Sequence, residues 1–144
     1  MARFYAIDEA NASIPEVERI LTALREQRLE LIELRDRAIG LTPEDGEAAD
    51  EAAEELRLIR LRMQGLIDQM QAGVARLVDL DITLREISTG LIDFPALMSG
   101  RQIWLCWRLG ETEVGHWHRI DEGFASRRPL TELPTGSGTG RPAA

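Results

Sequence analysis

The chain has 144 residues, a formal net charge of −8, one cysteine and no lysine. This length suits one domain, and a single cysteine excludes a disulfide within the chain. An acidic chain without clustered cations does not suit a broad nucleic-acid surface, and a chain without lysine has no lysine nucleophile or Schiff base. No apolar run is long enough to span a bilayer, and no secretory signal precedes the first element, so we expect a cytoplasmic protein with no membrane partner.

The first elements expected are a short strand and a long helix. Residues 3–7 (Arg-Phe-Tyr-Ala-Ile) have the composition of a strand. Pro15 suits the first turn of a helix, and Asp8 or Ser13 could cap it. The sequence therefore predicts a helix from about Pro15 to Ile39, followed by a break that contains glycine and proline at residues 40–46.

The second helix carries the most regular apolar pattern of the chain. It is predicted from about Glu47 to Asp79, some eight residues longer than the first. Its seam advances by three and four residues, which predicts coiled-coil-like packing in an antiparallel hairpin. The seam residues are Ala49, Ala52, Leu56, Ile59, Met63, Leu66, Met70, Gly73, Leu77 and Leu80.

Beyond the helices the apolar period approaches two, which predicts an antiparallel meander. The expected strands are residues 82–87, 91–94, 102–109 and 114–120, with turns at 95–100 and 110–113. Residues 131–144 are rich in glycine and proline and are predicted to be a disordered tail. The fold expected is α+β: one domain over residues 1–130, with a helical hairpin at about 13–80 packed on a sheet formed by 3–7 and 82–120.

The turn at residues 110–113 fixes a predicted register. It pairs Trp107 with His116, Leu105 with His118, and Cys106 with Trp117. Both histidines then share the apolar face of the sheet, whereas Cys106 lies on the opposite face. A slip of one residue would exchange these neighbours.

Two histidines at a spacing of two on a strand can chelate a transition metal such as zinc if further ligands are present. His116 and His118 are the candidates, with Asp121 and Glu122 as expected further ligands. Asp93 is another candidate, and Cys106 could join if its strand is bulged. The alternative is that both histidines pack in the core and bind backbone or carboxylate groups. Because the predicted pairing separates Cys106 from the histidines, the thiol is interpreted as a small buried hydrophobe rather than a nucleophile.

Arginines and tryptophans of the same region could bind a carboxylate or phosphate. In that interpretation the guanidinium groups hold the anion and a tryptophan ring stacks on it. Alternatively, the arginines pair with nearby acids. The residues of the candidate ligand site are Trp104, Arg108, Trp117, Arg119 and Arg127, with Arg128 beside them.

Several segments, in order, resemble a bacterial family catalogued as domain-of-unknown-function family 2203. They are residues 4–15, 91–96 (Leu-Ile-Asp-Phe-Pro-Ala), 105–111 (Leu-Cys-Trp-Arg-Leu-Gly-Glu), 116–118 (His-Trp-His), 123–125 (Gly-Phe-Ala) and 127–130. The resemblance covers about residues 4–130. The chain departs from the expected pattern at Ser126-Arg127-Arg128, where a glycine is expected. The resemblance implies no activity, substrate or catalytic residue.

Two functional hypotheses follow from the sequence. The first is a non-enzymatic interaction or assembly protein, because apolar residues off the seam of both helices need a partner, such as a second copy in a four-helix bundle or another helical protein. The second is a small-ligand or metal-binding module, possibly an enzyme, on the aromatic sheet. No other cofactor is predicted.

Overall fold

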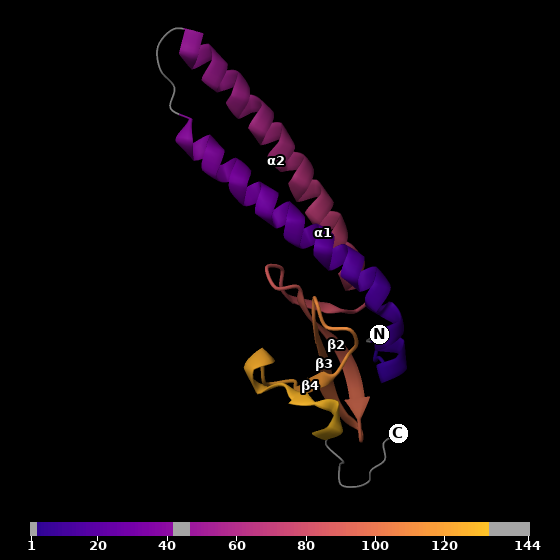
Figure 1. Cartoon of the computed structure of the whole chain (residues 1–144). Coiled ribbons are helices and arrows are strands. Elements are labelled where there is room, and N and C mark those ends of the chain that lie inside the picture. The colour runs from indigo at the N-terminus through magenta and orange to yellow at the C-terminus, as the bar shows by residue number, and fades with distance from the viewer. Residues whose placement is uncertain (1–2, 42–46, 133–144) are drawn as a thin grey trace.

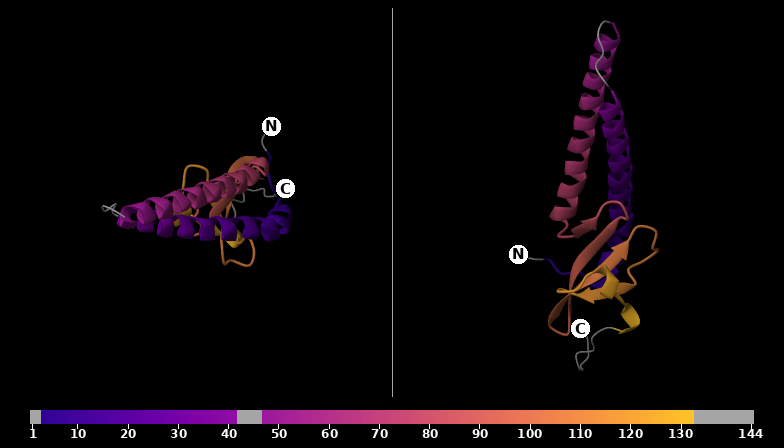
Figure 2. Two further views of the ribbon diagram at one scale, coloured as in Figure 1. Left: turned by 90° about the horizontal axis from the view of Figure 1, so that it is seen from above. Right: turned by 90° about the vertical axis from the view of Figure 1, so that its left-hand side faces the viewer.

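The computed structural model describes residues 3–41 and 47–132. Helices α1 (Ile7–Gly40) and α2 (Glu47–Asp79) come first and form an extended rod, one end of which lies against the sheet (Figure 1, Figure 2). The strands are β1 (Thr83–Glu86), β2 (Leu91–Met98), β3 (Arg101–Arg108), β4 (His116–Arg119) and β5 (Arg128–Pro129), with 3-10 turns η1 (Phe124–Ser126) and η2 (Leu130–Glu132). The predicted α+β class is confirmed.

Helix α1 begins eight positions before Pro15, so the predicted start and the predicted strand at residues 3–7 are wrong. The backbone N–H of Ala6 donates to Glu9 Oε1 at 2.9 Å, which satisfies one of the donors at this helix end. Pro15 lies inside the helix, where it cannot donate to the carbonyl of Asn11. The first turns of α1 bend away from the rest of the helix in Figure 1, and a proline is a common cause of such a bend.

Helix α2 has the predicted bounds and packs along α1. Its seam residues Ile59, Leu66 and Leu77 are buried. A Cβ atom on Gly73 would lie 3.3 Å from Leu24 Cδ2, so the two helices approach closely at this point. The helices have 34 and 33 residues, so the expected difference in length is wrong because α1 starts early.

Ion pairs join the exposed edges of the rod. Arg62 Nε lies 2.7 Å from Glu30 Oε2, and Arg76 Nε lies 2.6 Å from Glu16 Oε2. The acid nearer the start of α1, Glu16, pairs with the arginine nearer the end of α2, Arg76, as an antiparallel hairpin requires. Neither helix, within the described residues, is both long and apolar enough to cross a membrane.

The five strands form one antiparallel sheet in the order β1-β2-β3-β4-β5, so the predicted meander is confirmed. The turn predicted at residues 95–100 is wrong, because β2 runs through Pro95 to Met98. Pro95 is tolerated because β1 pairs with β2 only as far as Asp93. Beyond that point the N–H of Tyr5 donates to Pro95 O at 2.7 Å. The chain reverses at Ser99 and Gly100, whose φ angles of 53° and 77° suit a tight hairpin turn.

The register between β3 and β4 differs from the predicted one by a single residue. Cys106 pairs with His116, Leu105 with Trp117, and Trp104 with His118. The loop between these strands spans residues 109–115 instead of a four-residue turn, and the N–H of Val114 donates to Asn11 Oδ1 at 2.7 Å. Because this loop is anchored to α1, its length and register depend on a distant contact.

This slip exchanges the faces of β4. Trp117 lies in the apolar core, and His116 and His118 lie on the side of the sheet that carries Cys106, opposite to the prediction. A small cluster of Leu34, Ile59 and Leu66 lies between the helices, and the main core cluster joins α1, the end of α2 and the inner face of the sheet. Its largest members are Trp107, Trp117, Phe94, Leu21, Leu24, Leu77, Ile92 and Leu105.

The chain beyond β5 is described only as far as residue 132. Residues 131 and 132 belong to η2. The rest of the predicted tail, residues 133–144, lies outside the described residues, as do residues 42–46 of the predicted break between the helices.

Candidate metal centre

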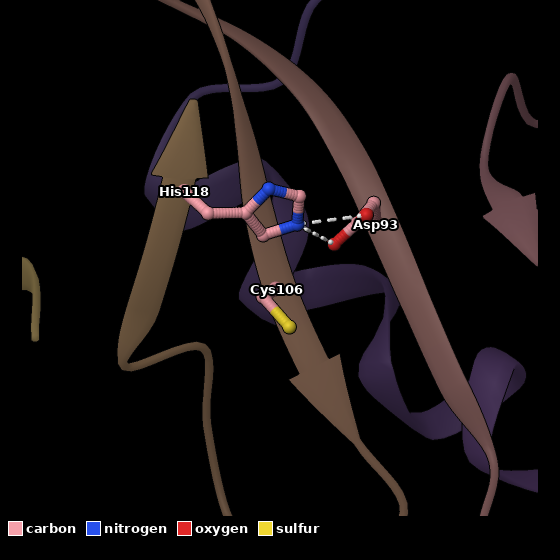
Figure 3. A group of neighbouring side chains, drawn as sticks. All are labelled: Asp93, Cys106 and His118. Atoms are coloured by element: carbon pink, nitrogen blue, oxygen red, sulfur yellow. Dashed lines mark hydrogen bonds and ion pairs between the residues drawn. The ribbon is translucent and has the colours of Figure 1, made fainter. Parts of the chain in front are cut away.

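Three polar side chains meet on the face of the sheet that points away from the helices. Asp93 comes from β2, Cys106 from β3 and His118 from β4. Asp93 and Cys106 are direct cross-strand partners, and His118 pairs with Trp104, two residues before Cys106. One ligand atom from each lies within 4.8 Å of the other two. Figure 3 shows His118 and Asp93 reaching toward each other across the strand that carries Cys106.

Asp93 and His118 are buried and bonded to each other. Asp93 is 1% exposed and His118 is 2% exposed. His118 Nε2 lies 2.9 Å from Asp93 Oδ2 and 3.0 Å from Asp93 Oδ1. Buried polar groups cost free energy unless they are paired, so this contact dominates the environment of both side chains.

A backbone carbonyl sets the tautomer of His118. Its Nδ1 lies 2.9 Å from the carbonyl oxygen of Arg119, and a carbonyl only accepts, so Nδ1 carries the hydrogen. In the neutral ring the lone pair of Nε2 then points at the Asp93 carboxylate. Two electron-rich groups at this distance repel each other unless a cation lies between them, and that cation is either a proton or a metal ion.

Cys106 supplies a thiol to the same place. Burial and the neighbouring Asp93 carboxylate raise the pKa of the Cys106 thiol to about 12, although a contact with Arg127 opposes the shift. The thiol is therefore protonated at neutral pH and does not act as a free nucleophile. The prediction of a buried thiol is confirmed, but the reason given for it, separation from the histidines, is wrong.

Two arginines flank the cluster. Arg85 Nε donates to Asp93 Oδ2 at 2.8 Å, and the Arg85 guanidinium lies over the Trp104 ring at 4.9 Å. Arg127 Nη1 lies 3.8 Å from Cys106 Sγ and also pairs with Glu111. Asp93 and Cys106 therefore each have a guanidinium beside them.

Sequence reasoning did not find Arg85. The pairing of β1 with β2 shifts between Leu84 and Glu86, so Arg85 occupies a bulge. Thr83 is the cross-strand partner of Asp93, so Arg85, two residues further along β1, lies on the same face of the sheet as Asp93. The only signal in the sequence is an arginine in a predicted strand, which is too common to mark a site.

Of the four predicted metal ligands, only His118 belongs to the cluster. His116 lies on the same face, but its Nδ1 is 3.9 Å from Glu111 Oε2. Glu122 pairs with Arg128 at 2.9 Å. Asp121 lies outside the cluster, in the wall of a cavity beside it. The two alternative ligands considered from the sequence, Asp93 and Cys106, complete the cluster, and Cys106 does so without a bulge in its own strand.

The predicted ligand residues do not converge on one pocket. Arg119 and Arg128 lie over the Trp117 ring, which is buried in the core. The guanidinium groups of Arg108 and Arg127 lie 5.2 Å and 4.5 Å from the centre of the Phe124 ring. The sequence did not predict Phe124 as part of this site. Trp104 has Arg85 beside it instead. The arginines thus stack on three separate rings.

A cavity of about 280 Å³ adjoins the cluster and includes all three of its residues in its wall. The other residues of the wall are Arg85, Leu91, Ile120, Asp121, Glu122, Gly123 and Phe124. The three residues therefore belong to the wall of this cavity, although each is at most 2% exposed.

The model of a protein family described as "Uncharacterized conserved protein (DUF2203)" matches residues 3–130. The chain belongs to the DUF2203 family. The resemblance seen in the sequence motifs is thereby confirmed. No curated protein and no solved structure matches the chain at a significant level. The three cluster residues and all five strands lie within the segment matched by the DUF2203 model.

Proposed function

We propose that this DUF2203 protein binds a divalent transition metal, with zinc the best match, through Asp93, Cys106 and His118. The observation that carries the proposal is the 2.9 Å contact between His118 Nε2 and the Asp93 carboxylate, made while Nδ1 donates to Arg119 O, with a thiol beside both. A carboxylate, an imidazole and a thiolate are the donors that zinc takes in proteins.

The spacing of the nitrogen and oxygen donors is compatible with one ion, and the sulfur lies within 4.8 Å of both. Zinc lies about 2.0–2.2 Å from nitrogen and oxygen ligands and about 2.3 Å from sulfur, so tetrahedral donors are separated by roughly 3.2–3.7 Å. The nitrogen and oxygen atoms at 2.9–3.0 Å need to move apart by only a few tenths of an ångström. The thiol would lose its proton to the solvent as the ion binds.

The surroundings of the cluster resemble those of established metal sites. Histidine ligands usually donate their second ring N–H to a carbonyl or carboxylate, as His118 does to Arg119 O. Ligand carboxylates usually accept a further hydrogen bond, as Asp93 does from Arg85. These contacts fix the orientation of two ligands before any ion arrives.

A proton shared by His118 and Asp93 would satisfy the same contact, and metal analysis separates the two cases. Protein without a histidine tag, incubated with zinc and freed of excess ion, should retain about one equivalent. His118→Ala and Cys106→Ser should lose it. His116→Ala removes the same side chain from the same strand outside the cluster and should retain zinc. Wild-type protein without retained zinc, or equal retention by the His118 and His116 variants, would contradict the proposal.

A second candidate function is assembly through the rod. Leu31, Ile67, Met70, Gln71, Val74 and Ala75 line an apolar groove of about 440 Å³. The described part of the helices also exposes Leu29, Ile39, Leu58, Leu61 and Val78. We propose that a second copy covers this surface as a cytoplasmic homodimer in a coiled-coil-like four-helix bundle, without catalysis.

Light scattering after size-exclusion chromatography tests the assembly proposal. The wild-type protein should have the mass of a dimer at micromolar concentration. Ile67→Glu, in the groove, should give a monomer, whereas Ala72→Glu, which adds the same charge on the exposed opposite side of the same helix, should leave the mass unchanged. A wild-type monomer across the concentration range would exclude this assembly.

A further inference from the structure

We propose that the metal centre is open toward the 280 Å³ cavity and takes a small ligand with an anionic oxygen head and an apolar body. This inference rests on the proposed function, because the head would bind the metal ion directly. It goes further by assigning the chemical class of a ligand to the site.

The protein offers three donors where zinc takes at least four. Among the described residues, no other histidine, cysteine or acidic side chain brings a ligand atom into the 4.8 Å group. Asp121 and Glu122 share the cavity wall but lie outside that group, and Glu122 is paired with Arg128. Zinc sites with three protein ligands keep the fourth position for water or substrate.

We place the open position on the side of the cavity, because all three ligand residues belong to its wall. Pockets that bind drug-sized molecules have volumes of about 300 Å³ or more, so a cavity of about 280 Å³ suits a smaller molecule. The wall also offers apolar side chains from Leu91, Ile120 and Phe124. A ligand could therefore place its head on the ion and its body against these three side chains.

The metal ion and Arg85 favour an anionic oxygen as the head. The Asp93 carboxylate and the Cys106 thiolate together balance the charge of a divalent ion, and the ion still binds a further oxygen donor in its open position. Arg85 donates to Asp93 and also lines the cavity, so its guanidinium lies on the side from which the ligand binds. Of the two carboxylates in the same wall, Glu122 is paired with Arg128, and Asp121 is exposed to water as Arg85 is.

Cobalt-substituted full-length protein tests the inference, because the visible absorption of Co²⁺ reports its coordination. Acetohydroxamate and benzohydroxamate serve as probes with the same anionic head and different bodies. Each should shift the cobalt bands at one equivalent, and benzohydroxamate should bind at least threefold more tightly because its ring contacts the apolar wall. Arg85→Gln, measured at saturating Co²⁺, should weaken both probes at least fivefold, whereas Arg101→Gln, which is exposed and outside the cavity wall, should leave them unchanged.

The outcomes separate the two proposals. Cobalt bands that appear but do not respond to either hydroxamate would overturn the open position and leave the metal proposal standing. Ultrafiltration after addition of the probe shows whether the protein keeps its cobalt. Cobalt found in the filtrate would mean that the hydroxamate removes the ion from the protein instead of forming a ternary complex, and would overturn the inference. Absence of any protein-bound cobalt band would overturn both. Equal affinity of wild type and Arg85→Gln, with normal circular dichroism, would remove the assigned role of Arg85.

Discussion

At the scale of residues, the site depends on which side of a strand each side chain occupies. His118 and Cys106 could both be identified as candidates from their residue types, but a register shifted by one residue placed them on opposite faces. The true register depends on a loop held by Asn11, which lies 103 positions away from Val114 in the sequence. No local pattern in residues 105–118 contains that information, so the cluster could not be assembled from the sequence.

The thiol of Cys106 should react slowly with iodoacetamide in the native, metal-free protein. Cys106 is 1% exposed, and with a pKa of about 12 only about one thiol in 10⁴ is ionised at pH 8. Mass spectrometry over time should show alkylation at least a hundredfold slower than in guanidinium chloride. A native rate within tenfold of the unfolded rate would mean that the strand pairing around Cys106 opens readily.

Glu111 should contribute to stability at neutral pH and lose this contribution in acid. Burial acts to raise the pKa of Glu111, but hydrogen bonds from Arg127 and the backbone N–H of Arg108 lower it overall, below the usual 4.5. Because the unfolded state binds this proton more readily, stability is fully present above about pH 4.5 and falls as the pH drops through the folded-state pKa.

Thermal unfolding of wild type and Glu111→Gln between pH 7 and pH 3 measures this effect. The difference in melting temperature should be largest near pH 7 and shrink as the pH falls below about 4.5. Glu33→Gln, on the exposed face of α1, serves as the control and should change the melting temperature little. A constant gap for Glu111→Gln across the range would rule out the titration of this carboxylate as its source.

At the scale of elements, the regular seam predicted α2 correctly, because a helix of 33 residues repeats its signal many times. The start of α1 was misplaced because Pro15 is more common at a helix start than inside one. The extent of β2 was misplaced for a similar reason, since Pro95 suggests a turn. Pro95 is tolerated because β1 does not pair with β2 at that position, whereas Pro15 removes a helical hydrogen bond in the part of α1 that bends.

Two glycines of α2 should respond in opposite directions to substitution. Gly73 faces Leu24 closely, so Gly73→Leu should lower the free energy of unfolding by about 1–3 kcal/mol through overpacking. Gly65 has no neighbouring atom within 4 Å of an added Cβ, so Gly65→Ala should raise it by about 0.5–1 kcal/mol. Urea denaturation followed by circular dichroism measures both, and a destabilised Gly65→Ala would contradict the open environment.

At the scale of the whole molecule, the rod and the sheet share one apolar cluster, and the segment before α1 ties them together. The Tyr5 hydroxyl donates to Leu80 O at 2.5 Å, and its ring contacts Phe94 edge-on at 5.0 Å. Tyr5 therefore joins the end of α2 to β2. The sequence predicted only that Tyr5 belongs to a short strand, and not that this residue bridges the two parts.

Tyr5→Phe should keep the ring contact and remove only the hydrogen bond. The free energy of unfolding should fall by about 0.5–1.5 kcal/mol, with Leu80 O left to bind water. Chemical denaturation gives this value, and amide hydrogen exchange should be faster at Leu80 and Ile82, next to the lost bond. An unchanged stability would mean that Tyr5 stabilises the junction through its ring alone.

The bond between Asn11 and Val114 also has a consequence for the order in which the protein is made. At about 5–20 residues per second, a ribosome adds Val114 roughly 5–20 s after Asn11. During that interval the inner face of α1 has emerged, but the strands that complete its core have not. Helix α2 alone covers part of that face. The rest of the apolar face of α1 therefore stays exposed to other apolar surfaces until β4 leaves the exit tunnel.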